Sequence, residues 1–136
     1  MNAYGYLDDD ARHRFKIYAG YAVPVTDTLV SINYSYRSGL PYATTHADPS
    51  FGTVFDVPRG SYRGAVLNVF DLQLEQPVHL PFARNVTVSA IGSVFNILDS
   101  EQPLTYFTSN DSPTTVKTPA TYQRPRNYEV GFRVDF

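Results

Sequence analysis

The chain has 136 residues, which is enough for one domain, and it carries a heavy aromatic load of 11 tyrosines and 9 phenylalanines. The absence of cysteine excludes disulfides and thiolate metal sites, and a formal net charge of −2 gives no sign of a nucleic-acid partner. No apolar run is long enough to form a transmembrane helix.

The first eleven residues are polar and end in the acidic cluster Asp8-Asp9-Asp10. We expect a solvated loop here. The start has neither the basic region nor the apolar region of a signal peptide.

Two strands are predicted next, at about 12–24 and 29–37, with a tight turn containing Pro24 and Asp27 between them. Apolar side chains alternate with polar or small ones in both, so each strand should have one apolar and one polar face. The apolar faces are expected to carry Phe15, Ile17, Ala19, Tyr21 and Val23 on the first strand, and Val30, Ile32, Tyr34 and Tyr36 on the second.

A long segment at 38–65, rich in Gly, Pro, Thr and Asp, is expected to be a loop without regular structure. Such a loop is unusual in a compact soluble domain but ordinary on the outside of a membrane barrel. The third strand, at about 66–79, again alternates, and a short turn follows at 80–85. Its apolar face should carry Phe70, Leu72, Leu74, Gln76 and Val78.

The fourth strand, at about 86–98, is the least regular. Val88 and Ala90 continue the alternation, but Ile91 and Phe95 fall on the opposite parity. Either a β-bulge near Gly92 shifts the register or both faces are partly buried, and the pattern favours the bulge. A second long polar connection, 99–126, follows.

The last strand, 127–136, has the most regular alternation in the chain. Every even position is apolar, every odd position is polar, charged or glycine, and the chain ends on Phe136. Strand ends of soluble domains are usually solvated, whereas a strand of a membrane barrel turns its apolar side chains towards lipid.

No segment has the apolar spacing of a helix that would cover a sheet. Short and long connections alternate, which places 38–65 and 99–126 as external loops and the short turns on the periplasmic side of an outer-membrane barrel. The sequence therefore predicts an all-β fold. We expect residues 1–136 to be a single segment, an antiparallel up-and-down meander of about five strands that is part of a transmembrane β-barrel.

Several motifs, taken in order and spacing, resemble the C-terminal barrel segments of TonB-dependent outer-membrane receptors, from about Asp8 to Phe136. Arg59-Gly60-Ser61-Tyr62-Arg63-Gly64 resembles the carboxypeptidase-regulatory-like (Oar-type) branch of that family. The other motifs are Arg12-His13-Arg14-Phe15-Lys16, Tyr36-Arg37-Ser38-Gly39-Leu40-Pro41-Tyr42, Phe70-Asp71-Leu72-Gln73-Leu74, Val94-Phe95-Asn96-Ile97-Leu98 and the terminal Phe.

The resemblance implies a large plugged barrel, of roughly 22 strands, that imports a scarce nutrient across the bacterial outer membrane. With about five strands and no export signal, this chain is expected to be a C-terminal fragment of such a receptor. The implied partners are outer-membrane lipid, the barrel-assembly machinery, and the rest of the receptor barrel with its plug domain.

The resemblance also assigns roles to the two faces. The terminal strand matches the family's assembly signal and would at the same time face lipid, through Tyr128, Val130, Phe132, Val134 and Phe136. Lumen-facing polar residues would be Lys16, Arg37, Asp71, Glu75, Glu129, Arg133 and Asp135. These charges either contact the plug or substrate path or satisfy one another, and the second interpretation is favoured. Candidates for interfacial aromatic girdles, or for ordinary cross-strand packing, are Tyr21, Tyr34, Tyr36, Phe82 and Tyr128.

The sequence predicts no catalytic residue, no metal site and no cofactor. His13, His46 and His79 lie far apart along the chain, and no phosphate loop or nucleophile elbow occurs. Two alternatives to the receptor fragment stay open. One is a small outer-membrane barrel closed by several copies of the chain, and the other is a soluble β-sandwich or lipocalin-like binding protein with its apolar face turned inward.

Overall fold

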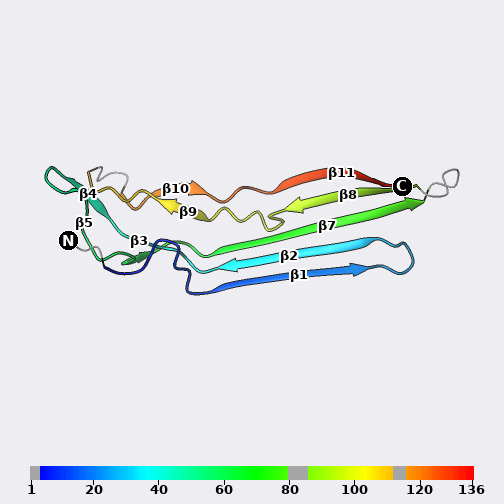
Figure 1. Cartoon of the computed structure of the whole chain (residues 1–136), viewed down its shortest axis with the longest axis horizontal. Coiled ribbons are helices and arrows are strands. Elements are labelled where there is room, and N and C mark those ends of the chain that lie inside the picture. The colour runs from blue at the N-terminus through cyan, green and yellow to red at the C-terminus, as the bar shows by residue number, and fades with distance from the viewer. Residues whose placement is uncertain (1–3, 80–85, 112–115) are drawn as a thin grey trace. The chain divides into compact units, whose positions relative to one another are not determined.

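The computed structural model describes residues 4–79, 86–111 and 116–136, and these form strands, turns and irregular segments without any helix (Figure 1). The chain divides into two compact units, each described below by itself. The sheet unit comprises 16–35, 68–100 and 124–136, and the loop unit comprises 1–15, 36–67 and 101–123.

The sheet unit is built on five long strands that lie side by side in sequence order. Neighbouring strands run in opposite directions, as Figure 1 shows, so the predicted all-β antiparallel meander is confirmed. The strands are β1 (Arg14–Ala22), β2 (Leu29–Arg37), β7 (Leu67–His79), β8 (Thr87–Phe95) and β11 (Asn127–Asp135).

The register between β7, β8 and β11 sorts the side chains into two faces. Gly92 on β8 lies opposite Leu74 on β7 and Val130 on β11, and this parity continues along all three strands. The apolar face carries Leu72, Leu74, Gln76 and Val78 of β7, Val88, Ala90, Gly92 and Val94 of β8, and Tyr128, Val130, Phe132 and Val134 of β11. The predicted alternation of β7 and β11 is therefore reproduced in a single continuous surface.

The bulge predicted near Gly92 is wrong. Residues of β8 pair one to one with β7 from Leu72–Val94 to His79–Thr87, and one to one with β11 along the whole strand. Ile91 and Phe95 accordingly lie on the polar face, where Ile91 is opposite Glu75 and Gly131. The alternation on β8 is interrupted because apolar residues occupy polar-face positions, while the backbone pairing of the strand stays regular.

The turn predicted between the first two strands is present. Val23 N–H donates to Thr28 O (2.9 Å), and Asp27 adopts a positive φ of 53°, a conformation that Asp tolerates better than most residues. The turn predicted at 80–85, including the girdle candidate Phe82, lies outside the described residues.

The loop unit contains short paired strands where unstructured loops were expected, so that expectation is wrong for both long connections. Asp48 Oδ1 accepts from the backbone N–H groups of Ser50 and Phe51 and so closes the tip of one hairpin. The pairs are β3 (Pro41–Tyr42) with β6 (Tyr62–Arg63), β4 (Thr45–Asp48) with β5 (Gly52–Phe55), and β9 (Pro103–Tyr106) with β10 (Pro119–Tyr122).

Burial is sparse in both units. Among the described residues, the buried apolar side chains are Ala43 (6% exposed) and Pro41, both in the loop unit. The polar residues buried to a similar degree include Ser89 and Asn96 of the sheet unit. A soluble domain of this length normally buries a contiguous apolar core, and the described residues do not form one.

Candidate functional site

The apolar face of the sheet unit is exposed along β11. Val130 is 79% exposed and Phe132 is 74% exposed, although these are large apolar side chains in the middle of a regular strand. The other terminal-strand residues of this face, Tyr128, Val134 and Phe136, are also exposed, as are Leu74 and Val78 on β7. A contiguous exposed apolar surface of this kind marks a place where another apolar phase or partner is bound.

A shallow groove crosses this apolar face at Gly92. Leu72, Leu74 and Val130 are among the residues that line it, and its volume is about 200 Å³. A Cβ atom added at Gly92 would meet nothing within 4 Å, so the groove exists because β8 has no side chain at this point. The geometry suits a slender apolar chain.

Charged side chains of the polar face pair with one another. The guanidinium of Arg133 donates to Asp135 on the same strand (Nε–Oδ2, 3.0 Å) and to Glu75 on β7 (Nη1–Oε2, 3.3 Å). The Glu75 side chain is 13% exposed, so its carboxylate is largely withdrawn from water and is compensated by Arg133. Three of the predicted polar-face residues therefore form one cluster.

A second cluster surrounds Asp71. Its carboxylate accepts from Asn33 Nδ2 on β2 (2.9 Å) and from the backbone N–H of Asn96 at the end of β8 (2.9 Å). The Oδ1 atom of Asn33 is buried and has no hydrogen-bond partner among the described residues. Asp71 thus links the middle of β2 and the end of β8 to β7.

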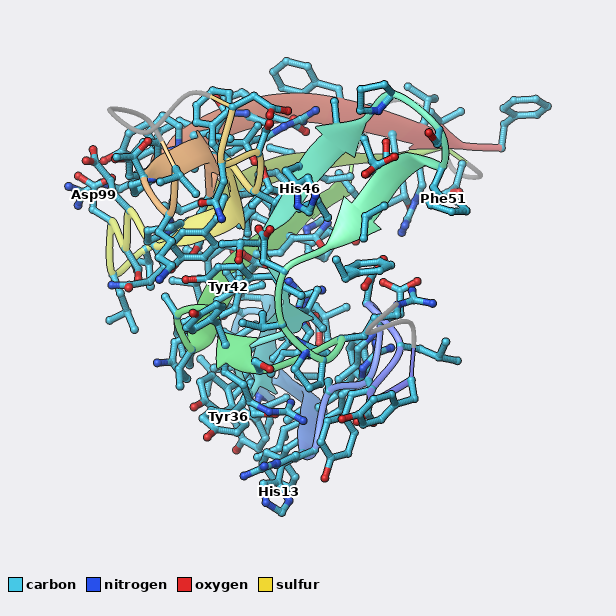
Figure 2. The ribbon with its side chains drawn as sticks, turned by 90° about the vertical axis from the view of Figure 1, so that its left-hand side faces the viewer. His13, Tyr36, Tyr42, His46, Phe51 and Asp99 are labelled. Carbon is cyan, nitrogen blue, oxygen red and sulfur yellow. The ribbon has the colours of Figure 1, made fainter. Side chains whose placement is uncertain are left out.

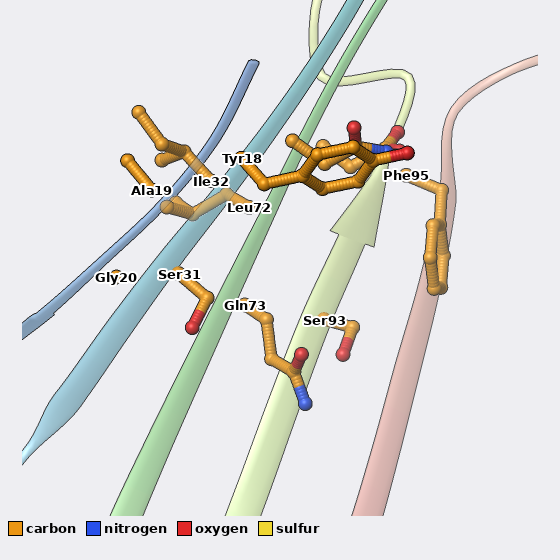
Figure 3. Close-up of a pocket in the computed structure, with 11 residues that line it drawn as sticks. Tyr18, Ala19, Gly20, Ser31, Ile32, Leu72, Gln73, Ser93 and Phe95 are labelled. Carbon is orange, nitrogen blue, oxygen red and sulfur yellow. The ribbon is translucent and has the colours of Figure 1, made fainter. Parts of the chain in front are cut away.

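Beside Asp71 the polar face is hollowed into an open trough of about 480 Å³ (Figure 3). Gly20, Ser31 and Ser93 line it together with the aromatic residues Tyr18 and Phe95. The trough belongs entirely to the sheet unit and presents hydroxyl, amide and carboxylate groups.

The remaining predicted polar residues are less tightly engaged. Lys16 on β1 is exposed, and Glu129 accepts a long hydrogen bond from Asn127 Nδ2 (3.5 Å). Arg37 does not join the charges of the sheet unit, because the structure places it in the loop unit at the end of β2.

Sequence reasoning missed the turn that follows β8. Asn96 is 4% exposed and has a positive φ of 51°. Its side-chain amide donates to the carbonyls of Ser100 (3.1 Å) and Arg124 (2.9 Å), and its Oδ1 accepts from Ser100 N–H (3.1 Å). Asn and Asp three residues apart, both suited to a left-handed conformation, were the available signal.

Asp99 completes this turn by pairing with Arg126 at the start of the β11 segment. Its carboxylate accepts from the backbone N–H of Arg126 (2.9 Å) and from the guanidinium (3.1 Å). The backbone hydrogen bond from Arg126 is the largest effect and holds the pKa of Asp99 below its ordinary value against desolvation, and the charge of Arg126 adds a smaller lowering effect.

The loop unit contains an aromatic cluster of its own. The rings of Tyr42 and Tyr106 stack with 4.7 Å between centroids and 6° between planes, and Tyr62 lies 5.5 Å from Tyr42. Lys117 Nζ lies 4.2 Å above the Tyr62 ring. Burial, and next the neighbouring Tyr106, raise the pKa of Tyr42.

Figure 2 shows His46 on β4 and Phe51 at the tip of the β4–β5 hairpin. His46 Nδ1 lies 2.6 Å from Asp56 Oδ1, and Asp56 also accepts from Asn110 Nδ2. This cluster ties the hairpin to the 108–111 segment, where Thr45 N–H donates to Thr108 O (2.8 Å). In the described parts of the chain, no three His, Cys, Asp or Glu side chains gather as metal ligands would.

Comparison of the chain with protein-family models, with curated proteins and with solved structures found no match. Among the described residues, no helix is long and apolar enough to cross a membrane.

Proposed function

We propose that the chain is a β-barrel segment of a TonB-dependent receptor in the bacterial outer membrane, whose complete barrel imports a scarce nutrient. The observation that carries the proposal is the exposed apolar stripe of β11, with Val130 and Phe132 each about three-quarters exposed. In this proposal the stripe faces lipid and is also read by the barrel-assembly machinery.

The polar face supports the same orientation. Arg133, Glu75 and Asp135 compensate one another on the side of the sheet opposite the apolar stripe. Charged side chains of this kind are accommodated in the polar lumen of a barrel, whereas an Arg at the lipid midplane would be destabilising by about 2–4 kcal/mol. The plug domain would lie against this face, where the trough beside Asp71 is open.

Sheet edges support the participation of further strands. Among the described strands, β1 and β11 each have one neighbour and so end the sheet. Unpaired backbone groups at an edge are satisfied in a barrel by closure. The rest of the receptor barrel would supply the missing neighbours, and in the alternative small oligomeric barrel further copies of this chain would do so.

The orientation is testable by cysteine scanning, because the natural chain has no cysteine. Single cysteines at 128–134 are labelled with an environment-sensitive dye, and the chain is reconstituted into vesicles containing a lipid with a quencher on its acyl chain. We expect quenching at the even positions, from Tyr128 to Val134, and none at the odd positions.

The control is the same scan in vesicles without the quencher, which reports dye environment alone. A soluble β-sandwich with its apolar face turned inward predicts no lipid quenching at either parity. That result, or equal quenching at the even and odd positions of 128–134, would contradict the proposal that the apolar face meets lipid. Chemical crosslinking of the reconstituted chain distinguishes a fragment from a self-closing oligomer.

A further inference from the structure

A separate hollow of about 320 Å³ lies wholly within the loop unit. This volume is at the lower end of the range for small-molecule pockets. Much of its wall is apolar, with contributions from Leu40, Phe55, Leu67 and Leu104, and the stacked Tyr42 and Tyr106 also line it. The hollow therefore accepts a compact ligand with an apolar body.

Arg37 lines this hollow and is the feature that defines its chemistry. Its Nε atom is buried and has no hydrogen-bond partner among the described residues, and no described carboxylate forms an ion pair with it. A buried Nε–H group without a partner is unfavourable, and a carboxylate that accepts from Nε and from an adjacent Nη in a bidentate arrangement satisfies it.

Two carboxylates lie at the same hollow, those of Asp8 and Asp9. Asp8 pairs with Arg59 (3.4 Å), whereas Asp9 is exposed and forms no ion pair with any described residue. The two acidic groups disfavour a multiply charged anion such as phosphate. They favour a ligand that brings a positive charge together with its carboxylate.

The segment that carries these acids is held in place by the loop that follows β5. Tyr6 N–H donates to Arg59 O (3.1 Å), and the guanidinium of Arg63 donates to Asp10 O (2.9 Å) and to Gly39 O (3.2 Å). Arg63 also lies 5.2 Å from the centre of the Tyr6 ring. The acidic side of the hollow is thus positioned by the Arg59–Arg63 motif and is not a free end.

From this lining we infer that the loop unit binds an apolar amino acid or dipeptide with both termini free. The α-carboxylate pairs with Arg37, the apolar side chain lies against Leu40, Phe55 and Leu104, and the α-ammonium faces Asp9. Binding does not depend on the membrane assignment. Only the further step, that such a peptide is the cargo of the parent receptor, rests on the proposed function.

The test uses the full chain in detergent micelles and isothermal titration with the dipeptide Leu-Leu. Its C-terminal amide should bind at least about tenfold more weakly, because a charge-assisted pair with Arg37 is lost. N-acetyl Leu-Leu should bind only a few-fold more weakly than Leu-Leu, because Asp9 is exposed and its charge is screened. These comparisons change the ligand and leave the fold of the protein untouched.

Protein variants identify the partners. Arg37→Gln should weaken Leu-Leu to the level of its amide and should abolish the difference between the two ligands. Asp9→Asn should abolish the difference between Leu-Leu and its N-acetyl form. Arg124→Gln removes an exposed arginine of the sheet unit and is the matched control. It should leave both differences in affinity, between Leu-Leu and its amide and between Leu-Leu and its N-acetyl form, unchanged.

Equal binding of Leu-Leu and its amide to the natural chain would overturn the inference, as would the absence of Leu-Leu binding. Near-ultraviolet circular dichroism of the tyrosines checks that the loop unit of Arg37→Gln is folded, and Arg37→Lys, which keeps the charge but loses the bidentate geometry, should be intermediate. If Leu-Leu binds but lipid quenching does not alternate along β11, the peptide site is supported and the proposed receptor function is rejected.

Discussion

Arg133 on β11 reaches Glu75 on β7 across the intervening strand β8, and the residue it crosses is Ser89. In the register Arg133 lies opposite Ser89, which in turn lies opposite Pro77, while Glu75 lies opposite Ile91. Ser89 is 1% exposed and is the largest fully buried side chain among the described residues. A small residue at this point leaves room for the guanidinium to pass over the strand.

This crossing predicts a size limit at position 89. Ser89→Val adds volume beneath the Arg133–Glu75 pair and should lower the free energy of unfolding by about 1–3 kcal/mol, the usual cost of overpacking. Ser89→Ala should be close to neutral. Both variants are unfolded with guanidinium chloride in detergent micelles, and unfolding is followed by circular dichroism. Equal stability of the two variants would contradict the crossing of Arg133 over Ser89.

Asn96 should tolerate no ordinary replacement. Asn96→Ala loses the side-chain bonds to Ser100 and Arg124 and keeps an unfavourable positive φ, so we expect a loss of about 2–4 kcal/mol. Asn96→Gly relieves the backbone but not the lost bonds and should lie between Ala and the natural residue. Limited proteolysis after β8 provides the local measurement. Similar protection of all three proteins would show that the turn is not held by Asn96.

The sequence predicts the long strands well because a period of two is a local property of the chain. The same reasoning fails on β8, where an apolar Ile91 on the polar face gives the sequence pattern of a bulge. Only the register with β7 and β11 shows that no bulge is present in this strand. It also cannot find β3 and β6, which are two residues each and pair across some twenty positions. Strands so short leave no periodic signal.

Side-chain pairings between strands likewise cannot be read from a single sequence. The polar parity of Glu75 and Arg133 can be read from the sequence, and the structure brings these two side chains into contact. Which charge meets which depends on the order of strands and on Ser89. Arg37 has the parity of a polar-face residue, yet it ends β2 and joins the hollow of the loop unit.

Acid should release the turn between β8 and β11. The pKa of Asp99 is lowered in the folded state by its bonds to Arg126, so its contribution to stability is present above the ordinary carboxyl pKa of about 4. That contribution is lost as the pH falls through the lowered value. Unfolding of the natural chain and of Asp99→Asn, measured between neutral pH and pH values below about 4, should converge at the acid end. Parallel curves throughout would exclude a role for Asp99.

Alkali should affect the aromatic cluster. The pKa of Tyr42 is raised in the folded state by burial and by Tyr106, so its contribution to stability is complete below the ordinary tyrosine value of about 10 and is lost as the pH rises towards the raised value. In a spectroscopic titration of tyrosinate, the latest-titrating component should disappear in Tyr42→Phe. Tyr122→Phe, which removes a 56% exposed tyrosine, should leave that component in place.

The proposed orientation of the sheet predicts a large effect and a small effect for the same substitution at two adjacent positions of β11. Val130 projects from the apolar face and is 79% exposed, and Gly131 projects from the polar face, where an added Cβ would meet nothing within 4 Å. Neither position is crowded, so a new arginine reports on the surroundings of each face and not on packing within the chain.

Val130→Arg should weaken partition of the chain into lipid vesicles by about 2–4 kcal/mol, since the guanidinium would enter hydrocarbon near the middle of the strand. Gly131→Arg should change the partition far less, because its side chain stays on the face that carries Arg133 and Glu75. Vesicle flotation at several lipid concentrations measures both. An inverted order of the two variants would mean that the polar face, and not the apolar one, meets the lipid, whereas equal partition would mean that neither does.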